Sequence, residues 1–241
     1  MRIAVISDIH ANLEALTAVF EDMDPWAPAY VVSLGDNVGY GADPEAVLAF
    51  LREQGVKSVM GNHEYGLTVP GGMDWFNPTA RLAVARTREL LCPESLAFIA
   101  ALPKYLVRDG LRFVHGMPPD KTHNYFFKYN GKALESVFTD MTERVAFIGH
   151  THMLEYAVFD GKEAVRGELE KGSMALDPGK KYILNIGSVG QPRDGNRKAK
   201  YALYDPEASR LEIRFVAYDR ELAAKKIRGI GMPVQYADKL L

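Results

Sequence analysis

Imidazole and carboxylate side chains recur along this chain at the ends of short apolar runs. Asp8 and His10 follow the first such run, residues 2–7. The other residues placed in this way are Asp36, Asn62, His63, His115, His150 and His152. Imidazole, carboxylate and amide donors together suit divalent ions such as manganese, iron, zinc, cobalt or nickel. The first hypothesis is therefore a transition-metal site.

The number of candidate ligands exceeds what one ion can hold. The predicted metal ligands are Asp8, His10, Asp36, Asn62, His115, His150 and His152. A carboxylate that bridges two ions about 3.5–4 Å apart would accommodate them all, as in two-metal hydrolases. Taken alone, the D-x-H at 8–10 and the G-D at 35–36 are more typical of solvated turns, and the H-x-H at 150–152 could be a satisfied polar loop. The G-N-H-E at 61–64 carries more information. The occurrence of five motifs in order, all at predicted strand ends, favours the metal site.

The elements that must position these residues alternate in type. Apolar runs at 2–7, 30–34 and 57–60 are separated by helical patterns, the first of which has Asn12 as its expected N-cap. This order predicts a parallel sheet with right-handed crossovers. Ligands of open α/β sheets bind outside the carboxyl ends of the strands. The loops that carry the candidate ligands are therefore expected to meet at one edge.

The rest of the chain is first helical and then mostly β. We expect helices at 44–54, 77–91, 93–101, 131–140 and 219–228, and further strands at 104–108, 111–115, 144–148, 154–159, 163–168, 181–186, 200–205 and 210–218. The dipeptide at 109–110, Asp-Gly, predicts a hairpin turn. No linker-like segment divides the chain. The pattern indicates one domain, 1–241, of two packed sheets flanked by helices.

Composition excludes several classes of protein. The chain has 241 residues, and 29 Lys and Arg nearly balance 31 Asp and Glu. This balance argues against a stable nucleic-acid complex. The single cysteine, Cys92, excludes an intramolecular disulfide and favours a cytoplasmic location. Asp8 and His10 interrupt the first apolar run too early for a signal peptide, and no apolar stretch approaches the roughly 18 residues of a membrane span.

The ordered motifs D-x-H, G-D, G-N-H-E, H-G and G-H-x-H resemble those of the calcineurin-like metallophosphoesterase superfamily, from residue 3 to about residue 190. The segments 35–44 (GDNVGYGADP) and 187–195 (GSVGQPRDG) resemble a small bacterial and archaeal branch described as phosphodiesterase-like or diadenosine-tetraphosphatase-related. The resemblance implies a four-layer α/β/β/α sandwich of two mixed β-sheets flanked by helices. It also implies two divalent metal ions and a metal-dependent phosphoesterase that hydrolyses phosphodiester or phosphoanhydride bonds by a metal-bridging hydroxide.

The resemblance also assigns roles to individual residues. It places Asp8, His10 and His152 on the first metal, Asn62, His115 and His150 on the second, Asp36 as the bridge, and His63 as the catalytic imidazole near the leaving group. The expected substrate-binding residues are Asn62 and Arg193, with Arg193 in the loop that lies at the rim of the site in this family. The expected partner is a small phosphorylated or nucleotide substrate.

Two departures from the family pattern matter. Many members have Asp after G-N-H, whereas this chain has Glu64, which we expect to orient His63 from a different position. Protein Ser/Thr phosphatases have phosphate-binding arginines where this chain has Met60 and the segment 39–41 (Gly-Tyr-Gly). That difference makes a phosphoprotein phosphatase the weaker alternative.

The motifs also fit two further functions. A dinucleoside polyphosphate hydrolase would need the same ligands, and a non-catalytic interaction scaffold would share the same fold. The aromatic segment 125–129 either packs a loop against the core or contacts the substrate, and packing is the preferred interpretation. His123 is expected on the surface. The basic residues Arg197, Lys198 and Lys200 are expected at a solvated loop tip.

Overall fold

Two six-stranded mixed sheets pack face to face in the computed structural model, which describes residues 1–241. The strands are β1 (Ile3–Ile6), β2 (Tyr30–Ser33), β3 (Lys57–Ser58), β4 (Tyr105–Arg108), β5 (Leu111–Val114), β6 (Val145–Ile148), β7 (Leu154–Phe159), β8 (Ala164–Glu168), β9 (Gly172–Ala175), β10 (Lys181–Ile186), β11 (Ala199–Asp205) and β12 (Arg210–Val216). The first sheet has the order β3-β2-β1-β11-β12-β9 and the second the order β4-β5-β6-β10-β7-β8. The predicted sandwich of two mixed sheets is confirmed.

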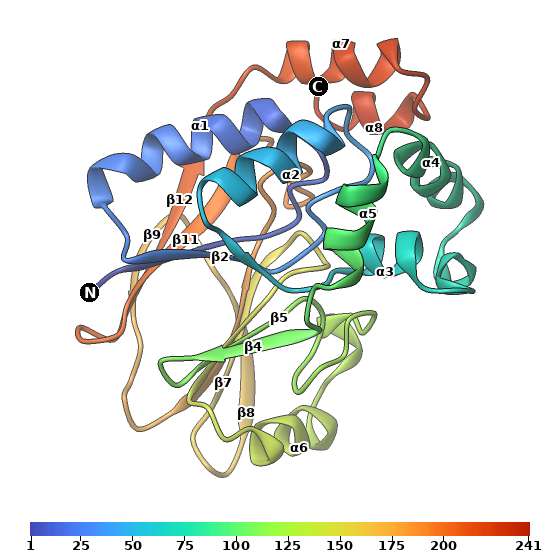
Figure 1. Ribbon diagram of the computed structural model, residues 1–241. Helices are drawn as coiled ribbons and strands as arrows, with labels where there is room; N and C mark the ends of the chain where they lie inside the picture. Colours follow the sequence, from blue (N-terminus) through green and yellow to red (C-terminus); the bar gives the residue numbers. More distant parts are fainter.

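Helices cover the outer face of each sheet (Figure 1). The helices are α1 (Leu13–Met23), α2 (Pro44–Glu53), α3 (Asn62–Thr68), α4 (Pro78–Glu89), α5 (Pro93–Ala100), α6 (Lys132–Asp140), α7 (Arg220–Gly229) and α8 (Gln235–Asp238), with short 3-10 turns at Asp24–Trp26, Gly72–Trp75 and Phe126–Lys128. Apolar residues of α1 and α2 pack on β1 and β11, and those of α6 pack on β6 and β10. No helix in the structure has the length and apolar character needed to cross a membrane.

The largest hydrophobic cluster lies between the two sheets. Val5 of β1 and Phe147 of β6 belong to it, and both are fully buried. Ala4 and Ala146, their neighbours in sequence, face the helices instead. Each strand therefore buries both of its faces, which is why the sequence shows nearly continuous apolar runs there.

The parallel strands of both sheets direct their carboxyl ends to the same region. In the first sheet β1, β2 and β3 run parallel, and in the second β5, β6 and β10 do so. The loops after these strands, together with the first turn of α3 after β3, contain every candidate site residue of the sequence analysis. Asn12 caps α1 as expected by accepting a hydrogen bond from the backbone N–H of Ala15, and its Nδ2 donates to the carbonyl of Gly190 in the loop after β10.

Three elements of the structure were not predicted, and several were predicted slightly too long, β3 among them. The unpredicted elements are β9, α3 and α8. β9 is an edge strand with mostly exposed residues, so it lacks the apolar alternation that marks a strand. β3 ends at Ser58 rather than residue 60, because the backbone N–H of Met60 bonds to the carbonyl of Pro103 rather than to a neighbouring strand.

Candidate metal centre

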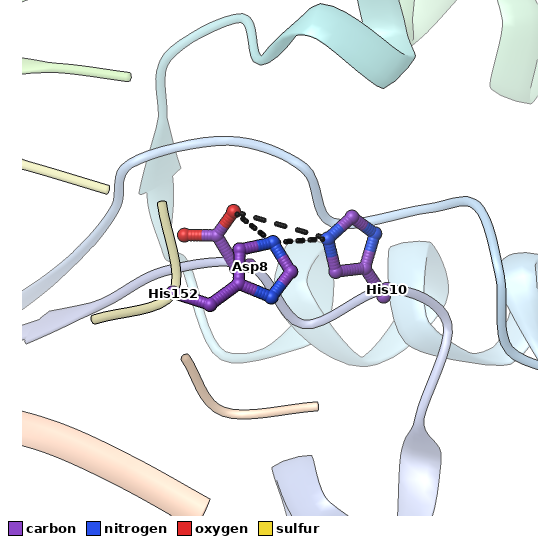
Figure 2. Close-up of side chains that lie close together, drawn as sticks. All are labelled: Asp8, His10 and His152. Carbon is purple, nitrogen blue, oxygen red and sulfur yellow. Dashed lines mark hydrogen bonds and ion pairs between the residues drawn. The ribbon is translucent and has the colours of Figure 1, made fainter. Parts of the chain in front are cut away.

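The two carboxylate oxygens of Asp8, just past β1, have different surroundings. Oδ2 accepts hydrogen bonds from Oγ of Ser7 at 2.5 Å and from the backbone N–H of His150 at 3.1 Å. Oδ1 is buried without a hydrogen bond, 3.2 Å from Nε2 of His152 and 3.8 Å from Nε2 of His10 (Figure 2). An unpartnered buried carboxylate oxygen that faces two imidazole nitrogens fits a bound cation.

Asp36 stands between two groups of candidate ligands. Its Oδ1 accepts the backbone N–H of His63 at 2.8 Å. Its Oδ2 lies 3.8 Å from Nε2 of His10 and 3.2 Å from Nε2 of His115. Burial alone would raise the pKa of Asp36, but the charges of His115 and His63 hold that pKa well below its ordinary value. The carboxylate is therefore ionised and faces both groups.

Three of the four candidate histidine ligands are oriented in the same way. In each, Nδ1 lies against a backbone carbonyl, which fixes Nδ1 as the protonated nitrogen and leaves Nε2 as the ligand atom. The pairs are His10 with Val38 at 3.3 Å, His115 with Leu34 at 2.9 Å and His152 with Gln191 at 2.5 Å. This is the hydrogen-bond pattern typical of metal-bound histidines in proteins.

The remaining candidate ligands complete the second group. Nε2 of His150 is buried and has no hydrogen-bond partner. Oδ1 of Asn62 lies 3.1 Å from Nε2 of His115. The ligand atoms form overlapping sets within 4.8 Å of one another, namely Asp8–His10–His152, His10–Asp36–His63 and Asp36–His115–His150. All seven predicted ligands therefore converge, and the donor set fits divalent transition ions.

The backbone at the centre adopts an uncommon conformation. Only ten residues other than glycine have a positive φ, and five of them are candidate ligands: Asp8 at 53°, His10 at 49°, Asp36 at 51°, His150 at 69° and His152 at 61°. The left-handed region costs most residues free energy and persists where the surroundings enforce it. The concentration of left-handed residues among the candidate ligands indicates that this region is the functional part of the molecule.

The expectation that Glu64 orients His63 is wrong. Oε2 of Glu64 accepts hydrogen bonds from the backbone N–H groups of Asp36 at 2.8 Å and Gly61 at 2.9 Å, and Oε1 accepts that of Asn37 at 2.7 Å. No hydrogen bond joins Glu64 to the imidazole of His63. The first turn of α3 points the Glu64 side chain back at the loop after β2, so Glu64 fixes the backbone that carries Asp36.

The ring of His63 is held by packing. It makes edge contacts with Tyr40 at 4.3 Å and Phe76 at 5.0 Å between ring centroids, and its Nδ1 is buried without a partner. A Cβ on Gly39, whose φ is 92°, would collide with Nδ1 of His63. Burial lowers the pKa of His63 to about 4. Packing therefore holds the imidazole in place, with its Nδ1 against Gly39.

The field of the carboxylates acts most strongly on His115. Burial alone would lower the pKa of His115, but the charge of Asp36 and its hydrogen bond, with a further contribution from Asp8, raise it to about 9. At His150 burial prevails and lowers the pKa to about 3. The negative potential that favours a proton on His115 equally favours a metal cation at the same place.

Arg193 lies at the edge of the centre, in the loop after β10. Its backbone N–H bonds to the carbonyl of His152, and its Nη2 donates to Oε1 of Gln191 at 3.2 Å. Burial and then the charge of Arg193 lower the pKa of His152. Asp194 pairs with Lys200 at 2.6 Å instead of with Arg193. The guanidinium thus remains exposed beside the ligands.

Two placements differ from the expectations for polar and aromatic residues. Lys200 is fully buried, and its ammonium group donates a hydrogen bond to Asp194. Lys200 therefore does not belong to a solvated loop tip. His123 is half-buried between Tyr65 and Trp75, with ring centroids 4.7 and 5.5 Å away, rather than on the surface. No motif includes His123, and its aromatic neighbours come from distant parts of the chain, so the sequence carried no signal for this position.

The aromatic segment 125–129 divides into two parts. Phe126 is buried and packs in the cluster under α6, with Tyr129 against the same cluster, as the packing interpretation predicts. Tyr125 instead stacks on the imidazole of His150, with centroids 4.0 Å apart and an interplanar angle of 19°. One residue of the segment therefore contacts a candidate metal ligand directly.

Comparison with known proteins adds independent support. Residues 1–209 match the model of the calcineurin-like phosphoesterase superfamily domain. An uncharacterized protein of Methanocaldococcus jannaschii is 35% identical to this chain, and the match covers 99% of this chain and 96% of that protein.

Two solved structures are similar over nearly their whole length. A metallophosphoesterase from Sphaerobacter thermophilus is 34% identical, with a TM-score of 0.87 and coverage of 100% of this chain and 98% of that chain. A hypothetical protein from Pyrococcus horikoshii is 18% identical, with a TM-score of 0.79 and coverage of 99% and 97%. At that identity the second structure supports the fold alone.

Proposed function

Because this chain belongs to the calcineurin-like phosphoesterase superfamily, whose members are metal-dependent hydrolases of phosphoester bonds, we propose that it cleaves phosphodiester or phosphoanhydride bonds at a centre of two divalent ions. One observation carries the proposal. Oδ2 of Asp36 lies between Nε2 of His10 and Nε2 of His115, so that a single carboxylate faces both groups of ligands. This is the arrangement that a bridging ligand requires.

The residues divide between the two ions as the motifs suggest. Asp8, His10 and His152 would hold one ion, Asn62, His115 and His150 the other, and Asp36 would touch both. When bound, such ions activate water as a nucleophile and neutralise charge on phosphoryl oxygens. Manganese is one of the ions that suit this donor set, with iron, zinc, cobalt and nickel.

The side chains around the ions complete the mechanism. The imidazole of His63 lies 4.8 Å from that of His10 between ring centroids, and we assign His63 the protonation of the leaving oxygen. Arg193 is exposed at the edge of the centre and would bind a phosphate oxygen, and Asn62 would face the same group. No serine, cysteine or aspartate nucleophile is needed, so the reaction proceeds without a covalent intermediate.

We propose that the substrate is a small phosphorylated molecule or a nucleotide. We also propose that the enzyme works in the cytoplasm. A dinucleoside polyphosphate hydrolase is a second form of the same proposal, because it needs the same ligands. A phosphoprotein phosphatase is less favoured, since Met60 and Tyr40 stand where phosphate-binding arginines would be required. A scaffold without activity is also less favoured, because all seven ligands converge with unpartnered buried atoms among them.

The test is an activity panel on the purified protein supplemented with each candidate metal. It compares a bis-aryl phosphodiester, an aryl phosphomonoester, a dinucleoside polyphosphate and a phosphopeptide. We expect kcat/KM to be highest for the diester or the dinucleoside polyphosphate, because a dianionic monoester gains more from the missing arginines than a monoanionic diester does. A clear preference for the phosphopeptide would overturn the proposed substrate class.

A further inference from the structure

A cavity of about 360 Å³ opens directly beside the metal centre. Asn62 and His150, two of the candidate ligands, form part of its wall. Its volume falls within the range of about 300–1,000 Å³ that is usual for small-molecule sites. A molecule whose phosphorus lies at the ligands would therefore extend into this space.

Five aromatic rings line part of the cavity. They belong to Tyr40, Trp75, Phe76, His123 and Tyr125. These residues come from the loop after β2, the segment before α4 and the loop after β5, and so from three distant parts of the chain. Their rings do not close into a packed core but leave an open space between them. Flat aromatic walls of this kind bind planar groups by stacking.

Trp75 is the most informative of these residues. The residue is 75% exposed, the highest value among the large apolar residues of the protein. Tryptophan side chains are usually well buried in folded proteins. A large aromatic surface that stays exposed commonly marks a binding site. Its nearest aromatic neighbour is His123, whose Nε2 is buried without a hydrogen-bond partner.

The cavity also offers polar groups suited to a heterocycle. Oδ1 of Asn77 accepts the backbone N–H of Ala80, which leaves its Nδ2 as a donor. Nδ2 of Asn124 donates to the hydroxyl of Tyr129, which leaves its Oδ1 as an acceptor. Lys128 adds a positive charge on the same wall. A nucleobase can use both stacking and edge hydrogen bonds, whereas a plain hydrocarbon ring uses only stacking.

We propose that this cavity binds the base of a nucleotide whose phosphate lies at the metal centre, so that the substrates are nucleotide esters or anhydrides. This inference rests on the proposed phosphoesterase function and names its substrate class. Trp75 stacks on the base, and Asn77 and Asn124 contact its edge.

The direct test measures binding rather than turnover. The chain has two tryptophans, and Trp26 is distant from the cavity, held under Arg2 and Arg214. In a Trp26→Phe variant the fluorescence therefore reports Trp75 alone. Titration of the metal-loaded variant with adenosine 5′-monophosphate should quench this fluorescence to saturation, whereas ribose 5-phosphate, which lacks the base, should leave it unchanged. Equal responses to the two ligands would overturn the inference.

Calorimetry on Trp75→Ala provides the second measurement. Stacking on an aromatic side chain contributes to the affinity for a base. Its loss in Trp75→Ala should weaken binding of adenosine 5′-monophosphate by about tenfold. Binding of ribose 5-phosphate should not change, and Tyr105→Ala, which removes an exposed aromatic ring at the start of β4 that does not line the cavity, should change neither. Unchanged nucleotide affinity in Trp75→Ala, or tighter binding of phenyl phosphate than of the nucleotide by the wild type, would contradict a base-binding cavity.

The results separate this inference from the proposed function. Diester hydrolysis without any quenching by the nucleotide would overturn the base-binding cavity and leave the phosphoesterase proposal intact. Saturable quenching in a protein that hydrolyses none of the panel substrates would overturn the phosphoesterase proposal and support the cavity as a nucleotide site.

Discussion

The carboxylate of Glu64 accepts the backbone N–H of Asp36 at 2.8 Å, so a residue outside the proposed ligand set fixes the loop that carries the proposed bridging ligand. The same carboxylate accepts the N–H groups of Gly61 and Asn37. These groups are buried with Glu64, where water is not available to replace it. The position of Asp36 therefore depends on an acidic side chain of α3.

Replacement of Glu64 by alanine should weaken metal binding although Glu64 is not a ligand. Each backbone N–H left without a partner costs about 1–3 kcal/mol, so Glu64→Ala should also lower the free energy of unfolding strongly. Glu64→Gln keeps one oxygen acceptor, so it should lose less metal affinity and less free energy of unfolding. Thermal unfolding and metal titration of the two variants check this order. A Glu64→Ala protein with wild-type metal affinity would contradict it.

Gly39 and Gly55 allow a matched test of how His63 is positioned. Both have a positive φ, so alanine at either position should cost about 1–2 kcal/mol of stability. Only at Gly39 would the added Cβ meet the imidazole of His63, whereas Gly55 faces open space. Gly39→Ala should therefore lose activity as well as stability, and Gly55→Ala should keep its kcat. Equal kcat values in the two variants would show that the fit around His63 is unimportant.

His63→Gln should keep the metals and the fold but lose about 10²–10⁴-fold in kcat, the usual contribution of general acid–base catalysis. The loss should shrink for substrates with good leaving groups, because these need little protonation. Rates over a series of aryl diesters and the metal content of the variant check the assignment. Because His63 also lies within reach of His10 and Asp36, loss of a metal in His63→Gln would instead identify it as a ligand.

Arg193→Ala should mainly raise KM, with a loss of about 1.5–3 kcal/mol for a charge-assisted hydrogen bond to phosphate. Arg197 is exposed in the same loop and serves as the control. Arg197→Ala should have only a small, salt-sensitive effect, because a distant charge acts on encounter alone. The test compares the KM and kcat of both variants with one diester under steady-state conditions. If the two variants behave alike, Arg193 does not bind the substrate.

The sequence predicted the sheets and the convergence of the ligands because both follow from local pattern. Buried strands such as β1 and β6 appear as apolar runs, and the carboxyl ends of parallel strands must meet at one edge. The roles of Glu64 and Trp75 could not be predicted in the same way. The contacts of Glu64 depend on the direction of α3, and the cavity around Trp75 combines residues that no spacing rule connects.

The most direct test of the two-metal centre is the metal content and diesterase activity of Asp36→Ala. Oδ2 of Asp36 faces both ligand groups, so its removal should disturb both ions. Elemental analysis should find up to two transition ions per chain in the wild type and in the control Asp140→Ala, whose side chain is exposed on α6. Asp36→Ala should lose tight binding of both ions together with hydrolysis of a bis-aryl phosphodiester. An Asp36→Ala protein that retained two tightly bound ions and the wild-type rate would contradict the bridged centre.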